Sequence, residues 1–195
     1  MIELRKVAAR RETAEVNISV QLNLDGRGIA NIDTGNRFLN HMLATLAKHA
    51  LVDLEVKASG DLKHHLSEDI ALTVGDAINK ALGDKRGIRR FGSALVPMDD
   101  SLARAAIDLG GRPYLNLDLK IQSSEIEDLK TEDIDHFFSS LVQSSESNIH
   151  LTVLYGTNDH HKVEAVTKAL ALALKEACSP EPRILDMIPS TKGEL

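Results

Sequence analysis

The chain has 195 residues, of which 43% are hydrophobic, so it can bury a substantial core in one domain or in two small fused halves. A formal net charge of −6 and an aromatic content of 3% argue against nucleic-acid binding, which depends on clustered cations and stacking side chains. Because no run approaches about 20 apolar residues and the first residues lack an apolar signal core, we expect no membrane partner. The one cysteine, Cys178, cannot form an internal disulfide, which suits the cytoplasm.

The first half of the chain alternates between strand and helix patterns. Apolar residues alternate with polar ones up to Asp25-Gly26, which is turn chemistry, and the next apolar residues are expected to form a return strand. The expected elements that we can place are strands over 16–24 and 29–32, a helix over 38–46, a strand over 51–56 and a helix over 70–83. This half is expected to have three strands before its first helix, one of which is not placed here, so the predicted order is three strands, helix, strand, helix.

The second half repeats this order. Its expected elements are strands over 92–98, 102–109 and 114–119, a helix over 134–141, a strand over 149–155 and a helix over 163–177. An internal duplication explains the repeat better than two unrelated domains do. We therefore predict a first α+β repeat over residues 1–88, a second α+β repeat over 89–178, and a C-terminal tail over 179–195.

The predicted fold class is α+β, with the helices packed between two mixed sheets. A strand, a helix and a strand of one sheet connect through a right-handed crossover, which puts both helices of a half on one face of its sheet. The helices of the two halves can then bury their apolar stripes against each other. Helix residues from both halves are expected to meet in one interior.

Both halves contain a G-x-x-x-H-H-x-x-E motif, and each motif follows another histidine in an earlier predicted helix. Residues 60–68 read Gly-Asp-Leu-Lys-His-His-Leu-Ser-Glu and align without gaps on residues 156–164, which read Gly-Thr-Asn-Asp-His-His-Lys-Val-Glu. The repeat-equivalent residues are His41, His64, His65 and Glu68 in the first half, and His136, His160, His161 and Glu164 in the second. Only His49 and His150 have no repeat partner.

This set has the chemistry of a metal site. His64 and Glu68 are four residues apart, and His65 and Glu68 three apart, so their side chains project from neighbouring faces of one helical turn. Three imidazoles and one carboxylate per half are enough for two ions with open positions. Manganese, iron, zinc and nickel all suit these ligands. One H-H-x-x-E motif alone could be an exposed helix start, but its presence in both copies favours metal binding.

At these residues the chain resembles the imidazoleglycerol-phosphate dehydratase family, whose hallmark is a repeated His-His-x-x-Glu motif in a duplicated fold of the ribosomal protein S5 domain 2-like type. The resemblance runs along nearly the whole chain. Its segments are Arg11–Glu15, Leu24–Gly26, Thr34-Gly35, Phe38–Leu43, Gly87–Asp99, Asp108–Leu115, His136–Phe138, Leu154–Gly156 and Pro189–Gly193.

The resemblance implies a hydro-lyase of histidine biosynthesis that converts imidazole glycerol phosphate to imidazole acetol phosphate. It implies two manganese ions per site with the substrate imidazole bound between them as imidazolate, Glu15 as the catalytic acid/base, and a homo-oligomer of trimers that assemble to a 24-mer with metal. By position in the family motifs, the substrate-binding residues are His49, Arg90, Arg112, Ser190 and Lys192. Arginine and lysine suit phosphate oxygens, and the tail would then carry a phosphate-binding segment.

The chain departs from the family pattern beside the predicted ligands. The loop before His64 is shorter and carries only Lys63, the family's Asp before the first helix histidine is Asn40, its Asp-Gln is Ala44-Thr45, and the third residue of its His-His-Thr motif is Leu66. We expect these changes to affect substrate contacts and rate more than metal binding or fold.

Two other classes of function fit the sequence less well than a dehydratase does. A dinuclear hydrolase would usually hold a bridging carboxylate and a metal-bound hydroxide, which six histidines with two glutamates fit poorly. A non-catalytic role in metal storage would require neither Glu15 nor the phosphate-binding residues, and the negative net charge disfavours a nucleic-acid module.

Overall fold

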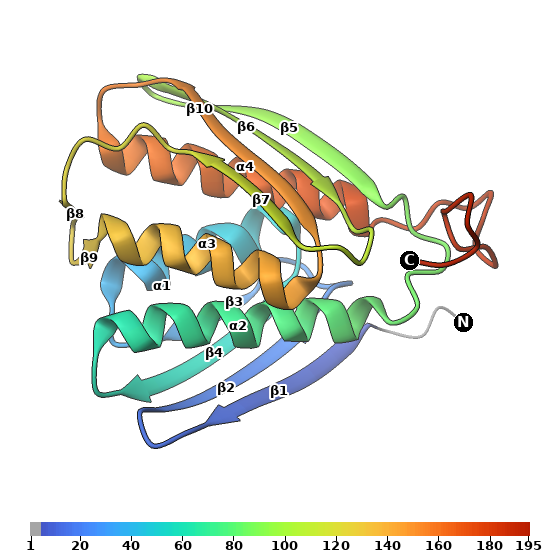
Figure 1. The fold of residues 1–195 in the computed structure, drawn as a ribbon, viewed down its shortest axis with the longest axis horizontal. Coiled ribbons are helices and arrows are strands. Elements are labelled where there is room, and N and C mark those ends of the chain that lie inside the picture. The colour runs from blue at the N-terminus through green and yellow to red at the C-terminus, as the bar shows by residue number, and fades with distance from the viewer. Residues whose placement is uncertain (1–4) are drawn as a thin grey trace.

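The computed structural model describes residues 5–195, and this part of the chain folds into two four-stranded mixed sheets with four helices between them (Figure 1). The predicted α+β fold is confirmed. In chain order the elements are β1 (Lys6–Glu12), β2 (Val16–Asn23), β3 (Ala30–Asp33), α1 (Arg37–Ala50), β4 (Asp53–Gly60), α2 (Lys63–Leu82), β5 (Phe91–Met98), β6 (Ser101–Asp108), β7 (Tyr114–Asp118), β8 (Glu125–Ile126), β9 (Leu129–Lys130), α3 (Thr131–Ser145), β10 (Asn148–Tyr155) and α4 (Asp159–Cys178).

The two sheets have the same topology. Their strand orders are β1-β2-β4-β3 and β5-β6-β10-β7. In the first sheet β3 and β4 are parallel and joined through α1, and in the second β7 and β10 are parallel and joined through α3. These are the strand, helix and strand units expected in each half. The second half differs by a short hairpin, β8-β9, inserted between β7 and α3.

The prediction that residues 29–32 return beside the strand over 16–24 was wrong. β2 pairs antiparallel with β1 and with β4, whereas β3 pairs parallel with β4. The segment after Asp25-Gly26 is held by Asp53 at the start of β4, whose Oδ1 accepts hydrogen bonds from the backbone N–H groups of Arg27 and Ile29 at 2.8 and 3.1 Å. The chain therefore crosses the end of β4 and does not form a hairpin with β2.

The helices of the two halves pack on each other in pairs. α2 lies along α3, and α1 lies along α4. The N-terminal ends of α2, α3 and α4 lie at one end of the molecule, and the tail after α4 lies at the other end (Figure 1). Because the H-H-x-x-E motifs open α2 and α4, this arrangement brings both motifs to the same end.

The cysteine lies in the core. Cys178 is buried at the end of α4, and burial raises the pKa of its thiol to about 12, as expected of a packing residue and not of a reactive thiol. Among residues 5–195, no helix has both the length and the apolar character that a membrane crossing requires.

Candidate metal centre

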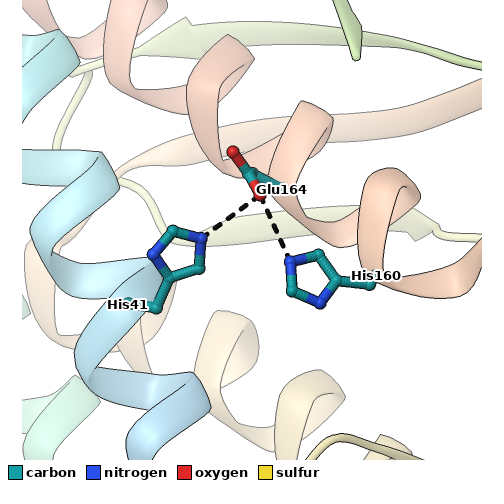
Figure 2. A group of neighbouring side chains, drawn as sticks. All are labelled: His41, His160 and Glu164. Carbon is teal, nitrogen blue, oxygen red and sulfur yellow. Dashed lines mark hydrogen bonds and ion pairs between the residues drawn. The ribbon is translucent and has the colours of Figure 1, made fainter. Parts of the chain in front are cut away.

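One group of possible metal ligands is formed by His41, His160 and Glu164, which we call the α4 group. Their ligand atoms all lie within 4.8 Å of one another. Oε2 of Glu164 is 3.2 Å from Nε2 of His41 and 3.3 Å from Nε2 of His160 (Figure 2). His41 comes from α1 in the first half, whereas the other two residues come from the first turns of α4, so the packing of α1 on α4 assembles the group.

The second group, which we call the α2 group, consists of His64, Glu68 and His136 and has the same 4.8 Å limit between ligand atoms. His64 and Glu68 lie on α2, and His136 reaches them from α3. The rings of His64 and His136 meet edge to face with their centroids 4.9 Å apart. Each group therefore takes two ligands from one motif and the upstream histidine from the other half of the chain.

The structure brings His65 and His161 into neither group. The ring of His65 lies 6.1 Å from that of His64, and the ring of His161 lies 6.2 Å from that of His160, measured between centroids. Within the described chain each group thus brings together three possible ligands, whereas the helical spacing suggested four per half. The two remaining imidazoles lie beside the groups.

A carboxylate holds Nδ1 of each histidine in the two motifs. The pairs are His64 with Asp133 at 2.7 Å, His65 with Asp61 at 2.8 Å, His160 with Glu127 at 3.0 Å and His161 with Asp100 at 2.6 Å. A histidine that ligates a metal through Nε2 commonly gives its other ring nitrogen to such an outer carboxylate, which fixes the ring and raises its basicity. The residues present therefore fit a pair of metal ions bound through Nε2 atoms.

Sequence reasoning missed these four carboxylates. Asp61 lies four residues before His65, so its spacing was a usable signal, whereas Asp133 carried none because it holds His64, 69 residues away. Asp100 and Glu127 carried none, because they approach His161 and His160 from loops 61 and 33 residues away.

Side chains accept hydrogen bonds from the backbone N–H groups in the first turns of α1 and α4. Asn36 caps α1 by accepting the N–H of Leu39 at 2.8 Å, and the carboxylate of Asp128 accepts the N–H groups of Arg37 and Phe38, both at 2.9 Å. Asn158 caps α4 in the same way through the N–H of His161 at 3.2 Å. These caps fix the helical turns that carry His41 and His160.

Glu164 stays ionised in this setting. Burial by itself would raise the pKa of this carboxyl, but the ammonium of Lys168, at 2.7 Å from Oε1, and the ring of His41 lower the pKa to about 2. Lys168 lies one helical turn after Glu164. A deprotonated carboxylate is the form that binds a metal ion.

A cavity of about 430 Å³ opens beside the α4 group. His41 and His160 line one side of it, and Arg37, Glu127 and Asp128 line the rest together with Phe38. A small polar molecule can therefore reach the imidazoles of this group from solvent.

A second cavity, also of about 430 Å³, is lined in part by the tail, which lies at the opposite end of the molecule (Figure 1). Arg90, Arg112, Ser190 and Lys192, the residues assigned to phosphate by the family resemblance, all line it. Arg90 is held by Asp108 at 2.6 Å and donates to the carbonyl of Pro189 at 2.9 Å, so it also fastens the tail. The tail is further tied to Gly87 and Arg89 by backbone hydrogen bonds.

The two ends are about one helix length apart. His160 lies in the first turn of α4, whereas the backbone N–H of Arg90 donates to the carbonyl of Ala177 in its last turn at 3.0 Å. A helix of this length, Asp159–Cys178, spans about 30 Å. Within one chain, the phosphate-type cavity and the imidazole groups are therefore too far apart to hold one small substrate.

The remaining predicted residues lie near the α4 and α2 groups. Glu15 lies on the turn between β1 and β2 with its Oε2 3.8 Å from Nδ1 of His65, and its side chain is exposed. His49 lies in the last turn of α1, where burial lowers its pKa and Lys168 lowers it further.

Asn40, which stands where the family has Asp, fits its place in the structure. Its Oδ1 accepts hydrogen bonds from both the N–H and the hydroxyl of Thr34, a role that a carboxylate oxygen can also play.

Comparison with known proteins identifies the family. The model of the family described as imidazoleglycerol-phosphate dehydratase matches residues 34–174. An imidazoleglycerol-phosphate dehydratase from Methanothermobacter thermautotrophicus is 51% identical and covers 100% of both chains, and one from Dehalococcoides mccartyi is 49% identical over 98% of this chain and 97% of the relative.

Two solved structures share the fold. The enzyme of Pyrococcus furiosus, in complex with (S)-C348, has a TM-score of 0.83 and 35% sequence identity, covering 95% of this chain and 99% of that one. The enzyme of Staphylococcus aureus has a TM-score of 0.81 and 32% identity, covering 90% of this chain and 100% of the other. The chain belongs to the imidazoleglycerol-phosphate dehydratase family, the hydro-lyases of histidine biosynthesis.

Proposed function

We propose that this protein dehydrates imidazole glycerol phosphate to imidazole acetol phosphate with the help of two manganese ions per site. The observation that carries the proposal is the pair of repeat-related His/Glu groups whose motif histidines are all held at Nδ1 by carboxylates. Such held imidazoles present Nε2 to an ion, and nitrogen and carboxylate ligands without thiolates suit manganese.

When bound, the ions would hold the substrate ring between them as imidazolate, which is electron-rich enough to expel the hydroxyl on the adjacent carbon. The chain's own residues supply the proton steps and the positioning. Glu15 is the proposed acid/base, since its carboxylate is solvent-accessible and lies beside the motif histidine His65. His49 is proposed as a further substrate-binding residue.

The substrate phosphate is proposed to bind Arg90, Arg112, Ser190 and Lys192. Their shared cavity supports this role, because two arginines, a lysine and a serine line it, and such side chains suit phosphate oxygens. The ring and phosphate of the substrate are separated by only a three-carbon chain. We therefore propose that the phosphate residues of one copy of the chain act with the imidazole groups of another.

This requirement supports a homo-oligomer, for which the family resemblance implies trimers that assemble to a 24-mer with metal. His65 and His161 fit the same scheme, since they belong to neither group of their own chain, and we propose that they complete the ligand set of a neighbour. A cytoplasmic location is proposed from the biosynthetic role. The substrate, a small phosphate ester, is the proposed partner besides further copies of the chain.

The test is reconstitution of the metal-free protein. We expect protein stripped by a chelator to have no dehydratase activity, and manganese to restore it, with His136→Ala remaining inactive and His150→Ala behaving like the unchanged chain. His150 is the matched control because it is exposed on β10 and belongs to neither group. No turnover with any divalent ion would rule the proposal out.

A further inference from the structure

We infer that the two metal groups are unequal, so that the α2 group binds its ion first and tightly and the α4 group binds the second ion more weakly. This inference rests on the proposed function, because it concerns the same two groups. It follows from a comparison of repeat-equivalent positions around Glu68 and Glu164, where the two halves of the chain carry different charges.

The first difference lies one turn after each ligand glutamate. Lys168 follows Glu164, and its Nζ lies 2.7 Å from Oε1 of that carboxylate. The equivalent residue after Glu68 is Leu72, which carries no charge. The lysine occupies one carboxylate oxygen of the α4 group and repels an incoming dication, and its side chain is only 19% exposed, so solvent screens this repulsion incompletely.

The second difference lies three residues before each upstream histidine. In the α2 group this position is Asp133, whose carboxylate is 3% exposed and holds Nδ1 of His64 at 2.7 Å. In the α4 group the equivalent residue is Phe38, which packs edge to face on His160 at a centroid distance of 5.1 Å. A neutral ring cannot replace the charge of a buried carboxylate.

The hairpin β8-β9 supplies a substitute for the missing carboxylate. Its turn residue Glu127 holds Nδ1 of His160 at 3.0 Å, but this side chain is 60% exposed. A charge in water supports a histidine ligand less than a buried one does, since solvent screens it. The α2 group therefore has the carboxylates of Glu68 and Asp133, whereas at the α4 group the charge of Glu164 is offset by Lys168.

A manganese titration of the metal-free full-length protein, followed by calorimetry, tests the inference. We expect two classes of site whose dissociation constants differ about tenfold or more, as changes around metal ligands commonly produce. His41→Ala should remove the weak class and His136→Ala the tight one. Two ions bound with equal affinity, or the reverse assignment, would overturn the inference.

Exchange of the two charge environments gives a sharper test. Lys168→Met, which keeps the aliphatic stem, should tighten the weak class toward the tight one, and Leu72→Lys should weaken the tight class. Lys175→Met removes the same charge from the exposed face of α4 and should leave both classes unchanged. Equal effects of Lys168→Met and Lys175→Met would contradict the assigned role of Lys168.

The titration is independent of turnover. A protein that dehydrates the substrate but shows one class of site would defeat this inference alone. A protein with two classes of site but no dehydratase activity would defeat the proposed function and leave the unequal groups in place.

Discussion

Nε2 of His41 lies 3.2 Å from Oε2 of Glu164, although the two residues are 123 positions apart and belong to different halves of the chain. The α2 group is crossed in the same way, since His136 joins His64 and Glu68. Neither half therefore contains a complete group by itself. Because α1 packs on α4 and α2 packs on α3, each half supplies one histidine to the group whose other members lie in the other half. The two halves thus exchange histidines.

This exchange predicts the effect of His41→Ala. The variant should lose one manganese ion per chain while the other remains, because the α2 group does not use His41. Metal content measured after dialysis against manganese checks this expectation. Activity should fall at least about 100-fold, because in the proposed mechanism both ions hold the substrate ring. Retention of both ions would exclude His41 as a ligand.

Asp133→Asn tests the outer carboxylates. Asp133 is buried and holds Nδ1 of His64 at 2.7 Å, so an uncharged amide there should lower manganese affinity by about 10–100-fold. Calorimetric titration measures the affinity. Asp76→Asn is the control and should bind manganese normally, since Asp76 is 43% exposed on α2, pairs with Lys80 and belongs to neither group. Equal affinities in the two variants would refute the role of Asp133.

Much of this arrangement was predictable from the sequence, because helical spacing and duplication are local signals. The strand, helix and strand units and the clustering of His41, His64 and His160 at one end follow from them. Two features were not predictable. The path of the chain from β2 past β4 to β3 in the first sheet involves Asp53, which holds the segment after Gly26, and the exchange of histidines between halves depends on which helices pair, a property of three-dimensional packing.

Glu15→Gln separates binding from chemistry. The side chain of Glu15 is 56% exposed on the β1–β2 turn, so the substitution should leave the fold and the metal content unchanged. Loss of the acid/base should lower kcat by about 100-fold or more with little change in KM. Steady-state kinetics check this, with Glu12→Gln, at an exposed position on β1, as the control. An unchanged kcat would remove Glu15 from the mechanism.

Asp25→Asn tests an ion pair that fastens the two halves. The Arg5 guanidinium hydrogen-bonds to both oxygens of Asp25 and to the carbonyl of Cys178 at the end of α4. The hydrogen bond from Arg5 lowers the pKa of Asp25 below its ordinary value of 3.8. The stabilisation is therefore fully present above pH 3.8 and is lost as the pH falls through the lowered pKa of the folded state.

At neutral pH the variant should consequently unfold with a free energy about 1–3 kcal/mol lower than the unchanged chain, and this difference should shrink in strong acid. Urea unfolding at a series of pH values measures both quantities. A difference that stays constant down to the acid limit would show that the effect of the substitution does not arise from the charge of Asp25.

Gly75→Ala tests the close crossing of α2 on α3. A Cβ atom at Gly75 would lie 2.7 Å from the carbonyl oxygen of Leu141 and 2.9 Å from the backbone nitrogen of Ser145, and it would also meet the hydroxyl of Ser144. The hydroxyl can rotate away, but the backbone atoms cannot. Alanine favours a helix over glycine by about 1 kcal/mol, whereas overpacking against two backbone atoms costs about 2–3 kcal/mol, the upper part of the usual range, so we expect a net loss of about 1–2 kcal/mol.

The midpoint of urea unfolding measures this loss, and Lys80→Ala, at an exposed position one turn further along α2, is the control. Lys80→Ala should change the free energy of unfolding by less than about 0.5 kcal/mol. Because α2 carries His64 and Glu68 while α3 carries His136, separation of these helices should also weaken manganese binding at the α2 group. A Gly75→Ala variant as stable as the unchanged chain would mean that α2 and α3 can separate without loss, and that the close contact at Gly75 does not position the α2 group.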